Sequence, residues 1–484
     1  MKSFPPLKLG AHLALTLGLC AALAACSTPG QPNAQARPLP ASAAGLSDAA
    51  TSTVSDAWWR SWNDAQLNQL IEQALQGSPS MADVQARVRR MQALSGVVDS
   101  AAWPQASLGA ELGRQRYSAN GLYPPPIAGS TRSNDTLQLG IGWSLDLWGQ
   151  HRAELAAAIG QVHAAEADAA VATNTLVMQV IRGHVALARL LAQHEVAVRT
   201  TQQRQQMQQL VAQRREAGLD TRIEQAQSDS TLADAAAQAE SLKEQITLAR
   251  HQLAVLTGQA PQALDAWRPQ LHALHIGVLP ATIGVDLLGR RPDVVAARWR
   301  VQAAQQDIQV ARTQFYPNVN LNAFAGFNAL GMSHLLDAGS RQYGLAPAVR
   351  LPLFDGGRLR AQLSGREAEH VSAVASYNNA VLNAVREAAD AIASSQSLER
   401  QWTEQSRALA SAQSAHALAQ QRQQAGLGNQ LAVLSAESAV LAQRRLSIEL
   451  QARQLDNRAK LMHALGGGWS EPSLPNTFAT QTPR

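Results

Sequence analysis

Alternating apolar and polar residues predict two pairs of strands. In residues 136–148, TLQLGIGWSLDLW, leucine, isoleucine and tryptophan alternate with glutamine, glycine, serine and aspartate. This period of two is typical of a strand with one wetted face. It recurs in residues 318–327 (NVNLNAFAGF) and 343–354 (YGLAPAVRLPLF), and more weakly in 106–112 (ASLGAEL). We therefore expect four strands in two hairpins.

Two long stretches of the chain lack proline and predict helices. No proline occurs between Pro126 and Pro261 or between Pro352 and Pro472. The helices predicted in these stretches span about 150–216, 221–257, 361–424 and 429–465. At a rise of 1.5 Å per residue, the longest reaches about 100 Å. Such helices must pack side by side, and their many alanines allow close approach.

The chain matches itself at a nearly constant offset. Pro79 matches Pro292 at a shift of 213, and the Ala-Gly-Leu sequence at 217–219 matches 425–427 at a shift of 208. Chance similarity between alanine-rich helices does not explain glycine and proline holding a fixed offset over so much chain. The predicted organisation is a first copy of one unit, a second copy and a short C-terminal tail, at 58–270, 271–468 and 469–484.

The N-terminal residues predict export. Lys2 and Lys8 precede an apolar segment, so residues 1–25 are interpreted as a secretory signal. It ends in Leu-Ala-Ala-Cys, which resembles the bacterial lipobox, in which cleavage exposes the cysteine, here Cys26, for lipid attachment. Ser27 favours delivery to the outer membrane. The alternative is that Cys26 is a small residue beside an ordinary cleavage site. Residues 26–57 are expected to form a lipidated linker.

Charge and motifs give no support for enzymatic or nucleic-acid chemistry. The net charge is only +5, and Lys and Arg are interspersed with Glu, Asp and Gln along the helical runs, as on solvated helix faces. His272 and His275 are the one close histidine pair, without acidic or cysteine ligands nearby, and are expected to lie on the surface. We expect no catalysis, no metal, no cofactor and no nucleic-acid partner.

The strands predict an assembly of several chains. A four-stranded sheet in lipid leaves two edges without hydrogen-bond partners, so it has to close with other chains. Two chains would give eight strands with a filled interior, whereas three give twelve and an open lumen. A homotrimer is therefore preferred over a soluble sandwich. The residues expected to line its water-filled side are Gln138, Ser144, Asn318, Asn320 and Asn322.

Nearly all of the predicted mature chain resembles a known family, the TolC-like outer-membrane efflux proteins, in the lipoprotein branch that serves RND-type multidrug pumps. The resemblance rests on three segments, WWRSWNDAQLNQLIEQAL, LLGRRPDVVAARWRVQAAQQDIQVARTQFYPNVNL and QQAGLGNQLAVLSAESAVL. It implies an α+β membrane protein whose trimer forms a 12-stranded β-barrel, with four strands per chain. A long α-helical barrel continues this barrel through the periplasm, and a mixed equatorial belt is built partly from the chain termini.

The resemblance also implies function and location. The duct lies in the outer membrane, is lipid-anchored and extends into the periplasm. It passively conducts small molecules such as drugs from an inner-membrane RND-type pump, through a periplasmic adaptor protein. Two alternatives remain: a duct of a protein-secretion system, and a helical envelope lipoprotein that transports nothing.

Two sites follow from the family pattern. A periplasmic gate is placed at Leu431 and Ser435, and because relatives carry acidic residues at Ser435 and Ala432, an apolar gate at Leu431 is favoured here. The alternative is that Leu431 makes an ordinary contact between helices. Adaptor docking is placed at the two turns of the helical hairpins, whose glycines otherwise only end a helix. The residues of this predicted docking site are Gly218, Leu219, Gly426, Leu427, Arg215 and Arg422.

Overall fold

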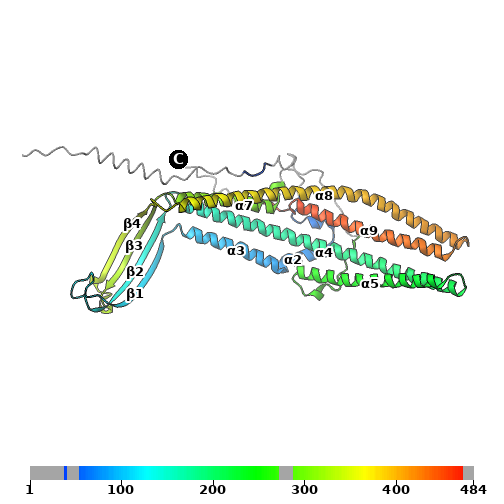
Figure 1. Ribbon diagram of the computed structural model, residues 1–484, viewed down its shortest axis with the longest axis horizontal. Coiled ribbons are helices and arrows are strands. Elements are labelled where there is room, and N and C mark those ends of the chain that lie inside the picture. The colour runs from blue at the N-terminus through cyan, green and yellow to red at the C-terminus, as the bar shows by residue number, and fades with distance from the viewer. Residues whose placement is uncertain (1–36, 41–53, 272–286, 472–484) are drawn as a thin grey trace, which may run out of the picture. The chain divides into compact units, whose positions relative to one another are not determined.

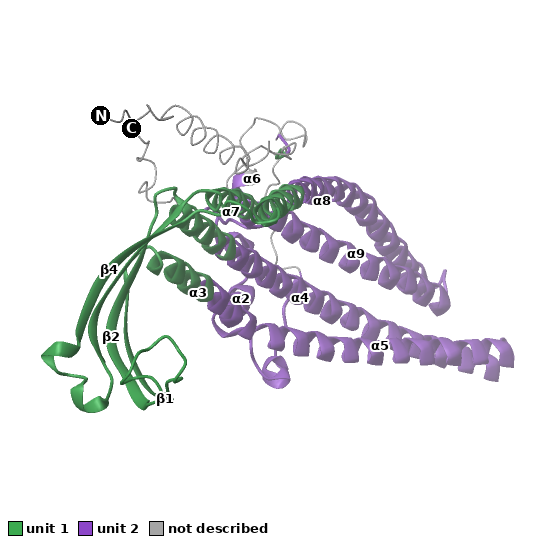
Figure 2. Cartoon of the chain, turned by 60° about the vertical axis from the view of Figure 1, so that its left-hand side comes forward, with its two compact units in different colours: residues 1–38, 89–165, 297–377 green, residues 39–88, 166–296, 378–484 purple. Residues whose placement is uncertain are grey.

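The computed structural model describes residues 37–40, 54–271 and 287–471. These belong to two compact units, coloured separately in Figure 2. Of the described residues, unit 1 comprises 37–38, 89–165 and 297–377, and unit 2 comprises 39–40, 54–88, 166–271, 287–296 and 378–471. The predicted signal, Cys26, His272, His275 and the tail beyond residue 471 lie outside the described residues.

The same order of elements occurs twice along the chain (Figure 1). The first series is α3(Pro79–Ser100), β1(Gln105–Arg116), β2(Thr131–Leu145), α4(Gln150–Glu216) and α5(Arg222–Leu256). The second is α7(Pro292–Thr313), β3(Asn318–Ala329), β4(Arg341–Arg350), α8(Arg358–Gln424) and α9(Gln430–Ala464). Corresponding helices have equal lengths: 22 residues in α3 and α7, 67 in α4 and α8, and 35 in α5 and α9.

Shorter helices accompany these two series. They are η2(Trp58–Trp62), α2(Ala65–Gly77), η3(Pro261–Leu264), α6(Leu287–Arg290), η5(Met332–His334) and η6(Ala338–Ser340). The four long helices were predicted to within three residues at every end, because proline and glycine mark their limits.

The sheet of unit 1 has four antiparallel strands in the order β1-β2-β3-β4. The register pairs Leu139 with both Leu108 and Ala325, so apolar residues of neighbouring strands share one face. All four predicted strands are present, but most of their ends differ from the prediction, and the largest differences are at β1, β2 and β4. β1 continues to Arg116 rather than ending at Leu112. β2 begins at Thr131 rather than 136, in a polar stretch without alternation, and β4 ends at Arg350 rather than Phe354, where Pro352 cannot donate to the ladder.

Unit 2 has its core where the N-terminal helices pack on the long ones. Trp58 and Trp62 lie with their ring centroids 5.9 Å apart and join buried residues of α2, α4, α5 and α9 in one cluster. Among the described helices, α4 is the one apolar and long enough to cross a membrane, and 56% of its most apolar window is buried in the protein. Packing accounts for much of its apolar character.

Ion pairs join the two helical hairpins within unit 2. Arginines of α4 face acidic residues of α9 in antiparallel order along the two helices. The pairs are Arg182–Asp456 at 2.7 Å, Arg189–Glu449 at 2.9 Å and Arg199–Glu437 at 2.7 Å. The two hairpins are therefore tied to each other by side chains along their length.

The Arg-Pro-Asp sequence at 291–293 has a structural role. Arg291 is buried and forms ion pairs with Asp293 at 2.7 Å and Glu387 at 2.8 Å, and it donates to the Ala464 carbonyl at 3.3 Å. Burial alone would raise the pKa of Asp293, but the hydrogen bonds and charge of Arg291 hold it below its ordinary value. Arg291 thus links α7, α8 and the end of α9.

Candidate functional site

The first hairpin turn joins α4 to α5. Gly218 has φ of +73°, its amide donates to the Arg215 carbonyl at 2.9 Å, and the Leu219 amide donates to the Arg214 carbonyl at 2.8 Å. This pair of bonds is the Schellman arrangement that ends a helix. Leu219 is 67% exposed. The turn therefore presents a leucine directly after its left-handed glycine.

The second turn, between α8 and α9, repeats that geometry. Gly426 also has φ of +73°, its amide donates to the Gln423 carbonyl at 3.0 Å, and the Leu427 amide donates to the Arg422 carbonyl at 2.8 Å. Leu427 is 71% exposed. A Cβ added at Gly218 or Gly426 would meet nothing within 4 Å. The backbone conformation, and not packing, requires glycine at both positions.

The side chains around the two turns differ. In the first turn, Arg214 Nε and Nη2 donate to Asp220 at 2.8 and 3.0 Å, and Thr221 and Glu224 form a capping box. The hydrogen bonds and charge of Arg214 lower the pKa of the Asp220 carboxyl. The Thr-x-x-Glu pattern is readable in the sequence and was missed by the sequence analysis.

In the second turn, Asn429 caps α9 by accepting from the Ala432 amide at 2.9 Å, and Gly428 stands where the first turn has Asp220. Arg422 Nη2 donates to the Leu427 carbonyl at 3.4 Å. Arg215 of the first turn is exposed. The second turn therefore has a neutral cap and no ion pair equivalent to Arg214–Asp220 among the described residues.

The predicted gate residues lie at the start of α9. Leu431 is half-buried and Ser435, one turn further, is exposed. The nearest acidic side chain that follows, Glu437, is buried and paired with Arg199 of α4 at 2.7 Å. Gln203 of α4 donates to the Leu434 carbonyl at 2.8 Å. These contacts hold the start of α9 against α4, and sequence reasoning did not find them.

The sheet has two chemically distinct faces. Its apolar face is exposed, with Leu108 at 72%, Leu345 at 68% and Val349 at 69%. The register also places Asp135 and Arg341 on this face, at the end of the sheet away from the helices of unit 1. The apolar residues of this face are Ala106, Leu108, Ala110, Leu112, Leu137, Leu139, Ile141, Trp143, Leu145, Val319, Leu321, Ala323, Ala325, Phe327, Tyr343, Leu345, Pro347 and Val349. The five residues predicted to line water all lie on the opposite face. An exposed apolar face of this extent suits contact with lipid.

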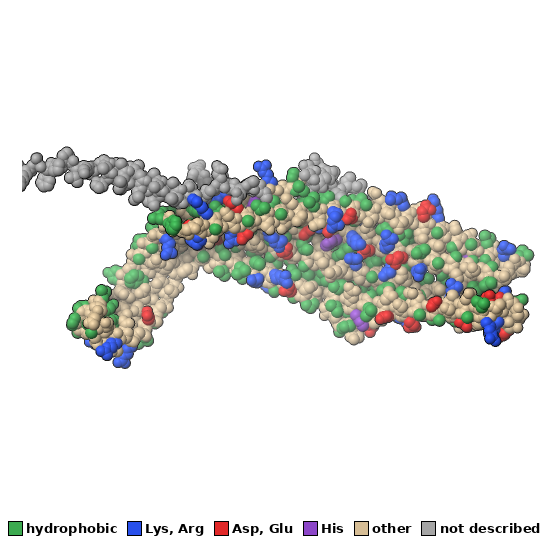
Figure 3. Space-filling model, in the orientation of Figure 1, with side chains coloured by type: hydrophobic (Ala, Val, Ile, Leu, Met, Phe, Trp, Pro, Cys, Tyr) green, Lys and Arg blue, Asp and Glu red, His purple; other side chains and the backbone are tan. Residues whose placement is uncertain are grey.

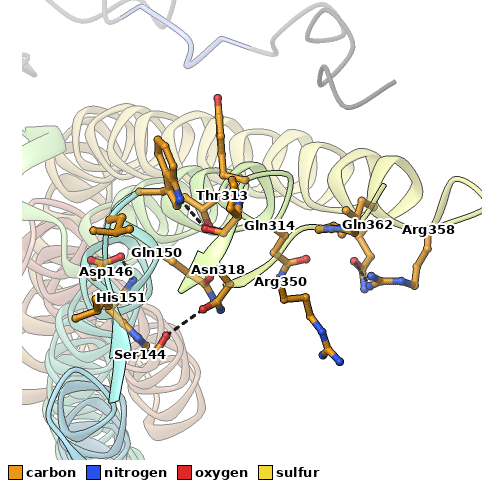
Figure 4. A pocket seen from close by; sticks show the side chains of 17 residues that line it. Ser144, Asp146, Gln150, His151, Thr313, Gln314, Asn318, Arg350, Arg358 and Gln362 are labelled. Carbon is orange, nitrogen blue, oxygen red and sulfur yellow. Dashed lines mark hydrogen bonds between the residues drawn. The ribbon is translucent and has the colours of Figure 1, made fainter. Parts of the chain in front are cut away.

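A cavity of about 360 Å³ lies in unit 1 where the strands end (Figure 4). Trp148 stacks on Tyr316 with centroids 5.0 Å apart, and its Nε1 donates to the Pro317 carbonyl at 2.7 Å. Its lining includes Ser144 and Asn318 of the polar face, together with Arg350 and Arg358. The arginines of this cavity could not be predicted from the sequence, because three separate segments of the chain build it.

Charge on the long helices is mixed in sign. On the side shown in Figure 3, basic and acidic side chains are interspersed over the helices of unit 2. Among the described residues, no group of three or more His, Cys, Asp or Glu side chains could hold a metal ion.

Comparison with known proteins identifies the fold. The family described as outer membrane efflux protein matches residues 70–259 and 284–467. The chain is similar to the crystal structure of VceC from Vibrio cholerae, with a TM-score of 0.78 and 34% identity over 86% of this chain and 99% of that one. It is also similar to the outer-membrane channel OprN, with a TM-score of 0.78 and 27% identity over 92% and 100% of the two chains.

Two relatives have functional names. The fusaric acid resistance protein FusA of Burkholderia cepacia is 38% identical over 72% of this chain and 67% of its own length. The multidrug resistance outer membrane protein MdtP of Escherichia coli K12 is 33% identical over 85% of this chain and 86% of its own.

The fold and the two-faced sheet define a subunit of an outer-membrane channel. The chain belongs to the outer membrane efflux protein family. The predicted fold class is confirmed: it is the α+β fold of the trimeric outer-membrane channels, with four strands per chain and a helical barrel. The predictions of an efflux duct, of a conduit that is not an enzyme, and of an outer-membrane location are confirmed with the family.

Proposed function

We propose that three copies of this chain close one barrel and form the outer-membrane duct of a tripartite small-molecule efflux system. The observation that carries this assembly is the open sheet, in which β1 and β4 each have a single neighbour. Three such sheets joined edge to edge satisfy these backbone groups, place the apolar face toward lipid and enclose a polar lumen. The drug-resistance names of the relatives favour small molecules over proteins as cargo.

The two hairpin turns are the proposed docking site for a periplasmic adaptor protein, which would connect the duct to an inner-membrane RND-type pump. Leu219 and Leu427 are apolar, exposed and held by the same backbone geometry, with Arg215 and Arg422 one turn before them. Two turns per chain would give six contacts around a trimer. An exposed leucine beside an arginine is a suitable anchor for a partner helix.

The proposed gate is apolar and formed by Leu431 from each chain, with Ser435 one turn further. Its support is the placement of both residues on the less buried side of α9, while Glu437 is bound to α4 and cannot contribute a free charge there. Leu431→Ser should raise the conductance of the closed channel in single-channel recordings. An unchanged closed-state conductance would assign Leu431 to ordinary helix packing.

A lipid on Cys26 is proposed as a second membrane anchor beside the barrel. Its support is the Leu-Ala-Ala-Cys sequence at 23–26. Cys26→Ala should abolish palmitate labelling, while transport survives because the barrel itself holds the protein in the bilayer. Labelling that persists in this variant would refute the anchor.

Disulfide crosslinking between chains tests the assembly. A cysteine at Ser107 of β1 is combined in turn with cysteines at Gln342, Gly344 and Ala346 of β4, all on the polar face. Because β1 and β4 of one chain are separated by two strands, a crosslink requires neighbouring chains. The expected product on oxidation is a covalent trimer. Crosslinked dimers as the final product, or monomers at all positions, would refute the trimer.

Planar-bilayer recordings and drug susceptibility test transport. The purified protein should conduct ions, and deletion of its gene should increase drug susceptibility. A deletion strain that loses protein secretion but keeps full drug resistance would instead favour a secretion duct.

A further inference from the structure

Two arginines lie at the polar face of the sheet, where it meets the helices of unit 1. Arg350 is the last residue of β4 and Arg358 the first of α8, and both line the cavity described above. In Figure 4 they lie on one side of this cavity, with Asp146 and His151 on the other.

The register fixes the face on which Arg350 lies. Arg350 pairs with Asn318, and Asn318 shares its parity with Asn320 and Asn322 on the polar face. Under the proposed function this face lines the lumen, so the guanidinium of Arg350 belongs to the water-filled side of the barrel.

The positive charge at this place is only partly compensated. Within the part of the chain that the structure describes, the exposed side chain of Arg350 forms no hydrogen bond or ion pair. Arg358 Nη1 donates to the neutral Gln362 at 3.1 Å, and the charge of Arg358 adds to the hydrogen bond from the Leu359 amide in lowering the pKa of Asp355. The nearby carboxylates are engaged with helix starts. Asp146 accepts from the amides of His151 and Arg152 at 3.2 Å, and Asp355 accepts from those of Gly357 and Leu359 at 2.9 and 2.8 Å.

The fold does not need these two cations. A positive side chain at the N-terminus of a helix is unfavourable because the helix dipole is positive there, and α8 has no acidic residue in its first turn. At the shift of 208, Gln150 of the first copy stands in place of Arg358, and Gly142 in place of Arg350. Neutral residues therefore serve the same backbone positions in the first copy.

We propose that Arg350 and Arg358 form an anion-binding site in the lumen, which takes the carboxylate group of small organic solutes. The site rests on the proposed function, because it faces the lumen only if the barrel closes. Guanidinium groups bind carboxylates through paired hydrogen bonds, and the cavity also presents the amides of Gln314, Asn318 and Gln362. Repeated in three chains, the arginines form a ring that attracts anions and repels cations.

Ion selectivity of the purified full-length protein tests this site. Wild-type and Arg350→Gln/Arg358→Gln proteins are compared in planar bilayers under a KCl gradient. The permeability ratio of chloride to potassium should fall by roughly fivefold or more, because one unit charge at about 4 Å in water already changes the occupancy of an ion about fivefold and the variant removes two charges from each chain. Added benzoate should reduce the current of the wild type and reduce it less in the variant.

Arg341→Gln is the matched control. Arg341 lies on the same strand, but it pairs with Phe327 on the apolar face. This substitution should leave both the permeability ratio and the benzoate effect unchanged. If the double variant does not insert, Arg358→Gln alone is measured, because the first copy has glutamine at that position. This single variant should lower the permeability ratio by a smaller factor than the double variant, and a ratio equal to that of the wild type would overturn the site.

The outcomes separate the site from the duct. An unchanged ratio in a conducting variant would overturn the anion site and leave the duct intact. An equal change of the permeability ratio in Arg341→Gln would also overturn the site. It would show that an arginine on either face of the sheet has the same effect on ion selectivity. A wild-type protein that carries no current would contradict the duct and the site together.

Discussion

Each helical hairpin has a tip, where its two helices are joined (Gly218 or Gly426), and a base, where its second helix ends (Gly258 or Gly466). The tips and the bases have the same local turn in different surroundings. Gly258 and Gly466 end α5 and α9 with φ of +73° and +97°, as Gly218 and Gly426 end α4 and α8. At all four, the glycine amide donates to the carbonyl three residues before it, and the next amide donates to the carbonyl five residues before it. Backbone geometry alone therefore does not distinguish the tips from the bases.

The neighbours of the four glycines do distinguish them. A Cβ at Gly258 would lie 2.1 Å from the Gly77 carbonyl oxygen, and one at Gly466 would lie 2.3 Å from that of Arg290. At both tip glycines the same atom meets nothing within 4 Å. The bases are fixed by contact with the rest of unit 2, whereas the tips leave their surface free. A surface held in shape but left unpacked is what a docking partner requires.

The largest expected effect is the loss of efflux when the tips become charged. Leu219→Asp combined with Leu427→Asp should abolish drug resistance. Each variant side chain would place a carboxylate in the contact with the adaptor, where burying an unpaired charge is unfavourable. Susceptibility of cells producing the variant measures this. Trimer assembly and insertion into the outer membrane should remain normal, because neither leucine packs within the chain.

The matched control for the tips is Leu219→Met combined with Leu427→Met, which keeps both positions apolar. This variant should retain resistance. Full resistance in the aspartate variant would show that the turns only reverse the chain.

The second expected effect is on stability at the bases. Gly258→Ala or Gly466→Ala should destabilise the protein by about 3 kcal/mol or more, because a close contact with backbone is added to left-handed strain. The melting temperature and the yield of assembled protein in detergent measure this. An alanine variant as stable as the wild type would show that these contacts open at little cost.

The sequence predicted the repeated turns but not this difference between them. Gly218 and Gly426 follow proline-free helices, so the helix ends could be predicted from local signals. The contact of Gly258 with Gly77 joins residues far apart in the sequence, and no local pattern encodes it. For the same reason, the ion pair between Glu437 and Arg199 and the cavity lined by Arg350 and Arg358 could not be predicted from local patterns. Thr221 and Glu224, by contrast, could have been found as a capping box.

A smaller effect is expected when the tip glycines are replaced. Gly218→Ala and Gly426→Ala should each cost about 1 to 2 kcal/mol, the cost of a left-handed residue with a Cβ, because no contact is added. Asparagine adopts the left-handed conformation more readily than alanine, so Gly218→Asn and Gly426→Asn should each destabilise the protein less than the corresponding alanine variant. Melting temperatures compared with the base variants test the order. A tip variant as unstable as Gly258→Ala would contradict the proposal that the tips are free of packing.

The smallest expected effect separates the two tips by pH. Because Arg214 lowers the pKa of Asp220 in the folded turn, the stabilisation from this carboxylate is present above the ordinary pKa of aspartate. It is lost as the pH falls below about 4 and through the lowered pKa. The second turn has Gly428 and Asn429 in this region and should not respond. Hydrogen exchange of residues 219–223, relative to residues 427–431, should therefore increase on acidification in the wild type. In Asp220→Asn the ratio should already be raised at neutral pH and should rise less with acid than in the wild type. The change that remains reports Glu224, whose pKa is lowered by its hydrogen bonds to Thr221. A wild-type ratio that stays constant with pH would show that Arg214 and Asp220 do not hold the first turn.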